Sequence, residues 1–262
     1  MSEAGLTVRQ VGFTNRAFWR NPPAAFFTFA FPLMFLVIFT SLFSDTTDVV
    51  IGGVLLRDIP TASYYIPAIA TFSIITATYT NLAISVTFLR ELGILKRVRG
   101  TPMPAGTYLT ARIIHAVFLA ILLVVIVTVF GVLFYDANVT LRTLPSFAAT
   151  VAVGAASFSA LGLALTSVIS NADASPAVVN ASVLPLLFLS GVFIPLTSSN
   201  AWYVWVAKIF PIYHFTQAML NTFLAPTGSG FQGWDLLIMG AWGVVGLLLA
   251  IRFFTWEPRN SA

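Results

Sequence analysis

Long apolar stretches alternate along the chain with short polar segments. A stretch of about 20 apolar residues is long enough to cross the roughly 30 Å hydrocarbon core of a bilayer as a helix. The pattern therefore predicts about six membrane-spanning helices. They cover residues 24–43, 64–88, 108–134, 146–169, 177–194 and 234–254.

The segment before the first span has a different pattern. Residues 6–20 mix apolar side chains with arginines, which is typical of a helix that lies in the membrane interface. Asn21, Pro22 and Pro23 end that helix, because proline has no amide hydrogen and disfavours helical dihedrals in the residue before it. After the first span we predict a polar loop over residues 44–63.

The composition strengthens the membrane interpretation. Hydrophobic residues make up 58% of the chain and charged residues only 8%, whereas soluble domains have about 25% charged residues. Six helices use about 120 residues, which leaves room for loops and tails but not for a separate soluble domain. We predict one all-α membrane domain over residues 1–262, made of a cytoplasmic interfacial helix (1–23), six membrane helices (24–254) and a cytoplasmic tail (255–262).

Charge and cysteine content exclude several kinds of site. The formal net charge is +4, but the basic residues flank the apolar spans, so we interpret them as topology signals and contacts to membrane lipids rather than a nucleic-acid surface. The chain has no cysteine, which excludes disulfides, thiolate metal sites and cysteine nucleophiles. We expect neither a metal nor a cofactor bound to this chain.

The distribution of basic residues predicts the orientation of the spans. If spans one, three and five enter from the cytoplasm, only Arg57, Arg142 and Lys208 of the 13 lysines and arginines lie outside. The others, down to Arg259 in the tail, lie inside, as the positive-inside rule requires. We therefore expect a multi-pass protein of the plasma (inner) membrane with both termini in the cytoplasm.

The predicted spans contain little that could power transport. A carrier coupled to protons or sodium usually keeps an ionisable residue deep in the membrane, and none of the spans has one centrally. His115 lies about two turns into the third span and is read as an interface or helix-packing residue. The chain has no G-x-x-x-x-G-K-[ST] loop, so if ATP drives it, a partner must bind the ATP.

The inner loop between spans two and three is the most informative segment. Leu92, Leu95 and Val98 fall on one helical face, whereas the cations between them fall largely off it. This spacing predicts a short amphipathic helix that ends at Gly100 and Pro102. From chemistry alone, the loop is either a contact for a partner or a basic loop that rests on anionic headgroups.

Two blocks of residues resemble a known family. The inner loop reads Arg90-Glu91-x-Gly93-x-Leu95-Lys96-Arg97-x-Arg99-x-Thr101-Pro102, followed by Tyr108-Leu109-x-Ala111-Arg112. This block is similar to the corresponding loop in permease subunits of ABC type-2 exporters, the drug and lipid exporters of the daunorubicin-resistance kind. Residues 189–196 and the block Phe210-Pro211-Ile212-Tyr213-His214 resemble the end of span five and the outer segment of the same family.

The resemblance covers nearly the whole chain and implies a specific machine. It implies a permease that pairs with a second copy or a homologous permease and with two separate ATP-binding subunits, which hold ATP and magnesium. Such a permease exports a hydrophobic or amphiphilic substrate and has no ATP site or enzyme activity of its own. In this interpretation the inner loop is the coupling helix that docks on the ATPase, through Arg90, Glu91, Gly93, Lys96, Arg97 and Arg99.

The outer segment over residues 196–224 is unusually apolar for an exposed loop. The resemblance implies two short helices that re-enter the outer leaflet and cap the pathway, which requires protein or a water-filled cavity around them. The alternative is a pair of helices that lie flat on the outer interface. The residues concerned are Trp202, Trp205, Pro211, Tyr213 and His214.

Polar residues in the second span form a candidate substrate pathway. Thr71, Thr78 and Ser85 are spaced by seven and share one helical face, with Asn81 nearby and Asn180 in the fifth span. They suit a lateral cavity between two permeases that accepts an amphiphile. The alternative is helix packing, because serine and threonine in membranes often bond only to backbone or to a neighbouring helix.

Two other classes of function stay open. A secondary carrier or channel needs no ATPase, but the spans lack the central charges that such proteins use. A membrane-embedded enzyme needs a nucleophile, base or metal set within reach. The chain has few candidate catalytic residues, since His115 and His214 fall on opposite predicted sides and Asp173 is a lone carboxylate in a short loop.

Overall fold

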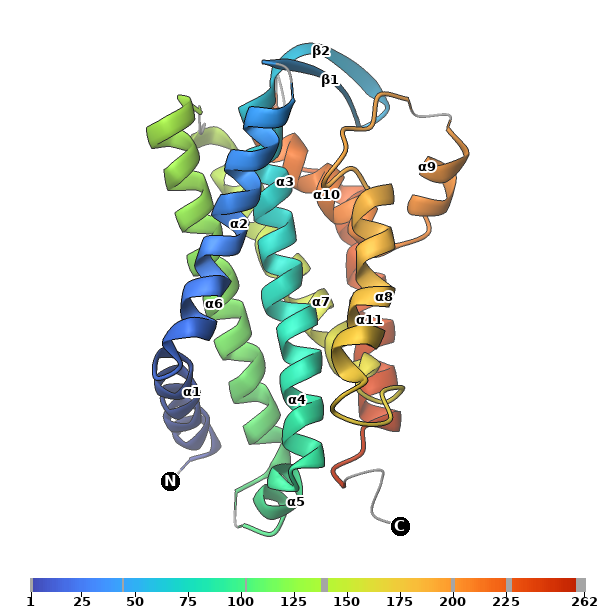
Figure 1. Cartoon of the computed structure of the whole chain (residues 1–262). Helices are drawn as coiled ribbons and strands as arrows, with labels where there is room; N and C mark the ends of the chain where they lie inside the picture. Colours follow the sequence, from blue (N-terminus) through green and yellow to red (C-terminus); the bar gives the residue numbers. More distant parts are fainter. Residues whose placement is uncertain are drawn as a thin grey trace.

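The structure is a computed structural model that describes residues 2–43, 45–101, 103–137, 141–198, 201–224 and 228–257. Long helices run side by side and form an elongated bundle, with a β-hairpin at one end and the short helix α5 at the other (Figure 1). We call these the hairpin end and the α5 end. Pro102, which was predicted to end the inner helix, and the tail residues from 258 onward, with Arg259, lie outside the described residues.

The N-terminal part forms two helices separated by a sharp break. Helix α1 (Glu3–Trp19) lies at the α5 end, and α2 (Pro22–Leu42) climbs from it towards the hairpin end (Figure 1). The break lies at Asn21, where it was predicted, but Pro22 already belongs to α2. Proline suits this first helical position, because the first amides of a helix have no intrahelical partner. Phe18 and Phe29 pack edge to face across the break, with ring centroids 6.2 Å apart.

The segment after α2 is a hairpin and not the polar loop that the sequence predicted over residues 44–63. Strands β1 (Thr46–Ile51) and β2 (Val54–Pro60) pair antiparallel. Gly52 and Gly53 connect them with φ angles of 58° and 84°. Positive φ at both central positions is the geometry that favours two-residue hairpin turns, and glycine adopts it without strain. The Gly-Gly pair between β-branched residues was the signal for this element.

The second predicted span is one continuous helical rod with a π-helical segment in its middle. It consists of α3 (Thr61–Ile75), η1 (Thr76–Thr80) and α4 (Asn81–Glu91). Gly162 of α7 (Leu144–Leu165) packs directly on this segment, since a Cβ added to Gly162 would lie 2.9 Å from the carbonyl oxygen of Tyr79. The absence of a side chain at Gly162 therefore allows α7 to approach the π segment.

The remaining elements complete the bundle. After the short helix α5 (Ile94–Arg99) come α6 (Ala105–Tyr135), the 3-10 turn η2 (Leu141–Thr143), α7, α8 (Ser175–Leu189), α9 (Trp202–Ala207), α10 (Pro211–Leu224) and α11 (Gly233–Phe253). Helices α7 and α11 approach closely, because Gly243 faces Ser157 and Gly246 faces Leu161. Glycine and serine at the contact let the backbones of two apolar helices approach each other closely.

Five helical stretches in the described part of the chain are long and apolar enough to cross a membrane. They are Pro22–Leu42, Thr61–Glu91, Gly106–Tyr135, Leu141–Leu165 and Gly233–Phe253. Helix α8 lies at the fifth predicted span but has only 15 residues. At 1.5 Å per residue it is about 22 Å long, which is shorter than the roughly 30 Å hydrocarbon core.

The core lies around α3, which is buried along most of its length. Tyr64 and Tyr65 are fully buried and donate hydrogen bonds to the carbonyl oxygens of Gly191 and Phe193, the latter at 3.1 Å. These bonds satisfy two phenols that would otherwise be costly to bury. They also hold the chain that follows α8 against the hairpin end of α3.

Candidate functional site

The α5 end carries a helix-turn-helix made by α4 and α5. Gly93 connects the two helices in a left-handed conformation, with φ 67°, which glycine adopts most easily. Leu95 of α5 is fully buried, and it shares an apolar cluster with Val86 and Tyr108. Leu92 does not lie on the buried face of α5 as predicted, because the helix begins only at Ile94 and Leu92 is 63% exposed.

The cations of the predicted coupling helix divide into two groups. Lys96, Arg97 and Arg99 lie in α5 and are exposed. With Leu95 buried beneath them, they form a small basic surface on a helix that is anchored to the bundle. Arg90 is different, since only 1% of it is exposed.

The guanidinium of Arg90 ties α4 to the end of α7. Its Nη1 and Nη2 atoms donate to the carbonyl oxygens of Thr166 and Ile169, each at 2.8 Å, and its Nε donates to Glu91 Oε1 at 3.1 Å. The last carbonyls of a helix lack intrahelical partners and carry the negative end of its dipole. Arg90 thus satisfies carbonyls beyond α7 and holds the turn between α7 and α8 against α4, instead of contributing to the exposed basic surface.

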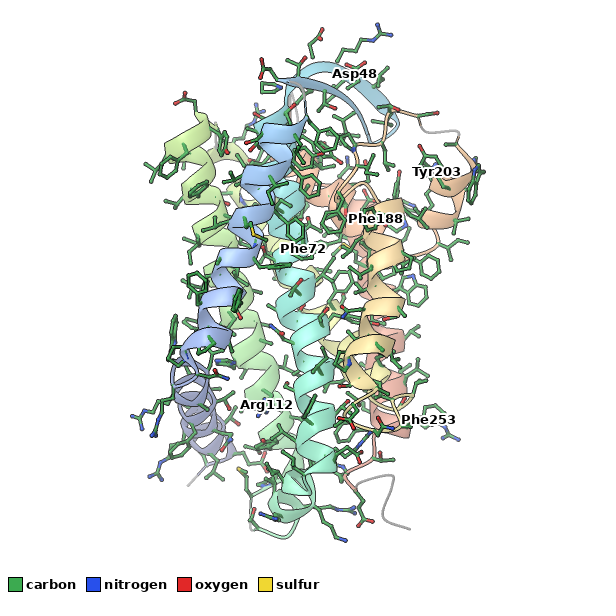
Figure 2. The ribbon with its side chains drawn as sticks, viewed as in Figure 1. Asp48, Phe72, Arg112, Phe188, Tyr203 and Phe253 are labelled. Carbon is green, nitrogen blue, oxygen red and sulfur yellow. The ribbon has the colours of Figure 1, made fainter. Side chains whose placement is uncertain are left out.

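Two lateral grooves border α2. One, of about 310 Å³, lies where α2 meets the middle of the second span and is lined by Asn81. The other, of about 520 Å³, lies between α2, α3 and α8 and is lined by Asn180. Phe72 of α3 and Phe188 of α8, which Figure 2 labels, also line the second groove. Thr76 of the π segment lines both grooves.

The other predicted pathway residues do not line these two grooves. Thr71 and Thr78 are fully buried, and their hydroxyls donate to the carbonyls of Pro67 and Ile74 at 2.9 and 2.6 Å. Ser85 is half-buried and donates to Leu82 at 3.3 Å. Their hydroxyls therefore bond within their own helical rod, as the packing alternative describes, while the two asparagines line the grooves.

The predicted outer segment consists of α9 and α10. Trp202 and Trp205 of α9 are 76% and 61% exposed, whereas most of α10 is buried. His214 of α10 accounts for part of this attachment, because its Nε2 lies 2.8 Å from the carbonyl oxygen of Lys208 and its Nδ1 lies 2.6 Å from Asp235 Oδ1. This carboxylate, in the first turn of α11, was not singled out in the sequence. Pro211 begins α10 and is buried, and Tyr213 is half-buried.

A family model described as ABC-2 type transporter matches residues 11–224. The chain belongs to this family. The match includes the helix-turn-helix at the α5 end, the grooves beside α2 and the helices α9 and α10. No curated protein matches the chain.

Membership of the ABC-2 type transporter family establishes a multi-pass membrane permease. The ABC-2 membrane domain is a permease subunit without an ATP-binding site, and permeases of this family work with ATP-binding subunits. No group of three or more histidine, cysteine, aspartate or glutamate side chains suited to a metal ion occurs within the described ranges.

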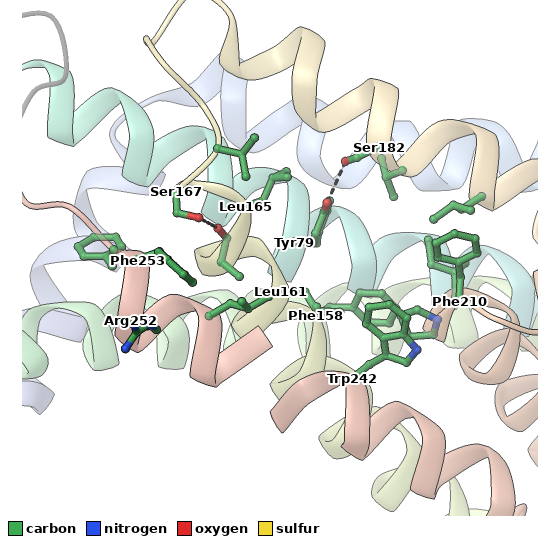
Figure 3. A pocket seen from close by; sticks show the side chains of 18 of the residues that line it. Tyr79, Phe158, Leu161, Leu165, Ser167, Ser182, Phe210, Trp242, Arg252 and Phe253 are labelled. Carbon is green, nitrogen blue, oxygen red and sulfur yellow. Dashed lines mark hydrogen bonds between the residues drawn. The ribbon is translucent and has the colours of Figure 1, made fainter. Parts of the chain in front are cut away.

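Sequence reasoning missed one cavity of this ABC-2 permease. It has a volume of about 880 Å³, lies between α7, α8 and α11, and contains the hydrogen-bonded pair Tyr79 and Ser182 in its wall (Figure 3). Arg252 lies at one end of it and Trp242 towards the other (Figure 3). Its lining comes from five separate elements, so no periodicity within one segment could have revealed it.

Proposed function

We propose that this chain is the membrane subunit of an ATP-driven exporter that moves a drug, lipid or other hydrophobic or amphiphilic compound across the plasma membrane. It works with two separate ATP-binding subunits and with a second permease, either the same chain or a homologue. The helix-turn-helix at the α5 end carries this proposal. It presents Lys96, Arg97 and Arg99 on an exposed helix while Leu95 anchors that helix in the bundle.

The contacts of this helix-turn-helix suggest how movement is transmitted. Closure of the ATP-binding subunits displaces α5, and the buried Arg90 carries the displacement to the turn between α7 and α8 through two carbonyls. Helix α8 lines the groove that contains Asn180. A push on α5 therefore reaches a wall of the proposed pathway through packed and hydrogen-bonded elements, which is the kind of connection that coupling requires.

The grooves beside α2 are suited to amphiphiles. Apolar residues form most of their lining, and the polar groups are Asn81 or Asn180 together with a few hydroxyls such as that of Thr76. Such a combination favours ligands that are mainly apolar with a small polar part. Both grooves lie on the same side of the molecule as α2, where a second permease would enclose them. Thr71, Thr78 and Ser85 serve as packing residues beside this pathway.

The sixth crossing in this proposal consists of α8 and the extended chain after it. Helix α8 follows the turn that Arg90 holds at the α5 end. At the other end of this stretch, the carbonyl oxygen of Leu196 accepts a hydrogen bond from the amide of Val50 in β1 at 2.7 Å. Residues 175–196 therefore connect the α5 end to the hairpin end, which supports six crossings with both termini in the cytoplasm.

The outer helices are proposed to re-enter the membrane. The ring of Phe210, just before α10, stacks on Trp242 at a centroid distance of 6.3 Å, and Trp242 is near the middle of α11. From that depth α10 rises to the hairpin end, where Gln217 accepts a hydrogen bond from the Gly52 amide at 3.3 Å. A helix with this slope is covered by protein, as re-entrant segments must be.

Co-purification and transport test the proposal. The permease is co-expressed with the P-loop ATPase proposed as its partner. The Lys96→Ala/Arg97→Ala/Arg99→Ala variant is compared with Arg16→Ala/Arg20→Ala, which removes exposed cations from α1 and its C-cap. We expect only the α5 variant to lose the ATPase and ATP-dependent substrate movement. Unchanged assembly and transport in the α5 variant would refute coupling through this surface, and substrate movement by the permease alone would favour a secondary carrier or channel.

A further inference from the structure

The cavity between α7, α8 and α11 has no role in the proposed pathway. Its volume is about 880 Å³, and apolar side chains such as Leu161, Leu165, Leu186 and Leu249 form most of its wall. Figure 3 shows the wall elongated along α11, with Arg252 and Phe253 near one end and Trp242 and Phe210 near the other. The cavity is therefore a groove with two different ends.

The length of the groove corresponds to one leaflet. Ten residues separate Trp242 from Arg252 on α11, which is about 15 Å at 1.5 Å per residue. Half of a hydrocarbon core of about 30 Å has the same depth. The groove thus extends from the end of α11 to about the middle of the membrane.

The Trp242 end of the groove, at about the middle of the membrane, is closed by the start of α10. Trp242 Nε1 donates to the carbonyl oxygen of Ile209 at 3.1 Å, and the Phe210 ring stacks on the indole. Pro211 and Ile212 complete this wall. A chain that enters from the Arg252 end cannot continue past the middle of the membrane, so the groove suits an acyl chain of one leaflet and not a molecule in transit between leaflets.

The two hydroxyls at mid-depth in the wall, those of Tyr79 and Ser182, are satisfied without a ligand. Ser182 Oγ donates to the carbonyl oxygen of Val179 at 2.7 Å, so its single hydrogen is used. Tyr79 must therefore be the donor in the 2.8 Å bond between the two hydroxyls. The wall offers no free donor at this depth, which favours a hydrocarbon occupant.

Arg252 gives the open end a positive charge. It is exposed, lies in the last turn of α11, and takes part in neither of the two ion pairs found among the described residues. Its guanidinium carbon lies 5.8 Å from the centroid of the Phe253 ring. A guanidinium at the end of a membrane helix, beside apolar groove walls, is well suited to bind a phosphate in the headgroup layer.

We propose that this groove binds one anionic phospholipid of the cytoplasmic leaflet, with an acyl chain between Arg252 and Trp242 and the phosphate on Arg252. The choice of leaflet rests on the proposed orientation, whereas the binding itself does not. The lipid is a resident ligand that fills the space between α8 and α11. It is distinct from a transported molecule in the grooves beside α2.

Native mass spectrometry of the delipidated full-length permease tests this site. The probes are phosphatidylglycerol and phosphatidylcholine with identical acyl chains. We expect phosphatidylglycerol to bind more tightly, because the choline cation of phosphatidylcholine offsets the charge of its phosphate. Arg252→Ala should reduce the affinity for phosphatidylglycerol about tenfold to a hundredfold, and the affinity for phosphatidylcholine by less. Arg252→Lys should retain part of the preference, and Arg16→Ala, which removes an exposed cation from α1, should retain all of it.

A groove-filling variant tests the position of the acyl chain. Leu249→Trp places an indole in the groove and should weaken binding of both lipids, whereas Leu247→Trp, on the same helix but outside the lining, should not. The proposal is overturned if the two lipids bind equally to the unmodified protein, or if Arg252→Ala leaves phosphatidylglycerol binding unchanged. Equal effects of the two tryptophans would place the lipid elsewhere.

Discussion

Arg90 provides the sharpest test of how the α5 end is held together. Replacing it by methionine keeps much of the side-chain volume but removes the guanidinium that bonds Thr166, Ile169 and Glu91. Because Arg90 is 1% exposed, solvent cannot easily replace these bonds. The carbonyls of Thr166 and Ile169 would then lose the bonds from the guanidinium, and Glu91 would lose its ion-pair partner.

The expected cost follows from these contacts. A hydrogen bond from a charged group contributes about 1.5–3 kcal/mol, and the bonds from the guanidinium to two carbonyls are lost, so we expect a loss of about 4 kcal/mol in the free energy of unfolding. At roughly 2–4 °C per kcal/mol for a chain of this size, the Tm should fall by about 10 °C. Arg90→Lys keeps the charge but not the forked donor geometry, so its loss should be intermediate.

Two measurements check this prediction. Thermal unfolding in detergent gives the Tm of Arg90→Met, Arg90→Lys and the control Arg97→Ala, whose exposed side chain should contribute less than about 0.5 kcal/mol. A cysteine at Val168, which is 70% exposed in the turn after α7, reports local mobility through its rate of reaction with maleimide. That rate should rise in Arg90→Met.

The Arg90 reasoning would be refuted by a specific pattern. If Arg90→Met melts at the same temperature as Arg97→Ala and the cysteine at Val168 reacts at an unchanged rate, then the buried bonds do not hold the turn. A lower Tm with an unchanged labelling rate would place the effect elsewhere in the bundle, and would remove Arg90 from the proposed path of coupling.

Three further predictions concern packing and topology. Gly246→Ala should lower the Tm, because its new Cβ would lie 2.9 Å from the backbone nitrogen of Leu161. The control Gly240→Ala, on the same helix, meets nothing within 4 Å and should be neutral or slightly stabilising. Equal Tm values for the two variants would contradict the close approach of α7 and α11. Tyr64→Phe removes the donor to the buried Gly191 carbonyl and should cost about 1–3 kcal/mol by the same thermal assay, and an unchanged Tm would mean that this bond contributes nothing. A single cysteine at Val54, which is 61% exposed in the hairpin, should react with an impermeant maleimide added outside the cell. A single cysteine at Val168 should react only when the reagent is on the inside, and the reverse pattern would exclude the proposed orientation.

The sequence by itself determined the membrane character and most of the long helices of this permease. Apolar stretches of about 20 residues have few alternatives in a bilayer, because a helix satisfies its own backbone hydrogen bonds. The break at Asn21 and the short helix after Gly93 were also predictable, since proline and glycine act locally. The family was recognisable for a similar reason, because its two blocks are continuous segments.

Only the tertiary structure decided how polar groups are used. Arg90 and Arg97 belong to the same basic loop in the sequence, yet one is buried against the end of α7 and the other is exposed. Likewise, Thr78 and Asn81 are three residues apart, but Asn81 lines a groove beside α2 whereas Thr78 is fully buried. Burial depends on which other helices pack nearby, and helical periodicity within one span does not specify those neighbours.

The groove between α7, α8 and α11 is determined entirely by the tertiary structure. Its wall comes from α7, α8, α10, α11 and the π segment, which are far apart in the sequence. Its closed end depends on the bond from Trp242 to Ile209, and its charged end depends on where α11 stops. The apolar pattern determines that these segments enter the membrane, whereas the packing of their side chains determines where space for a lipid is left between them.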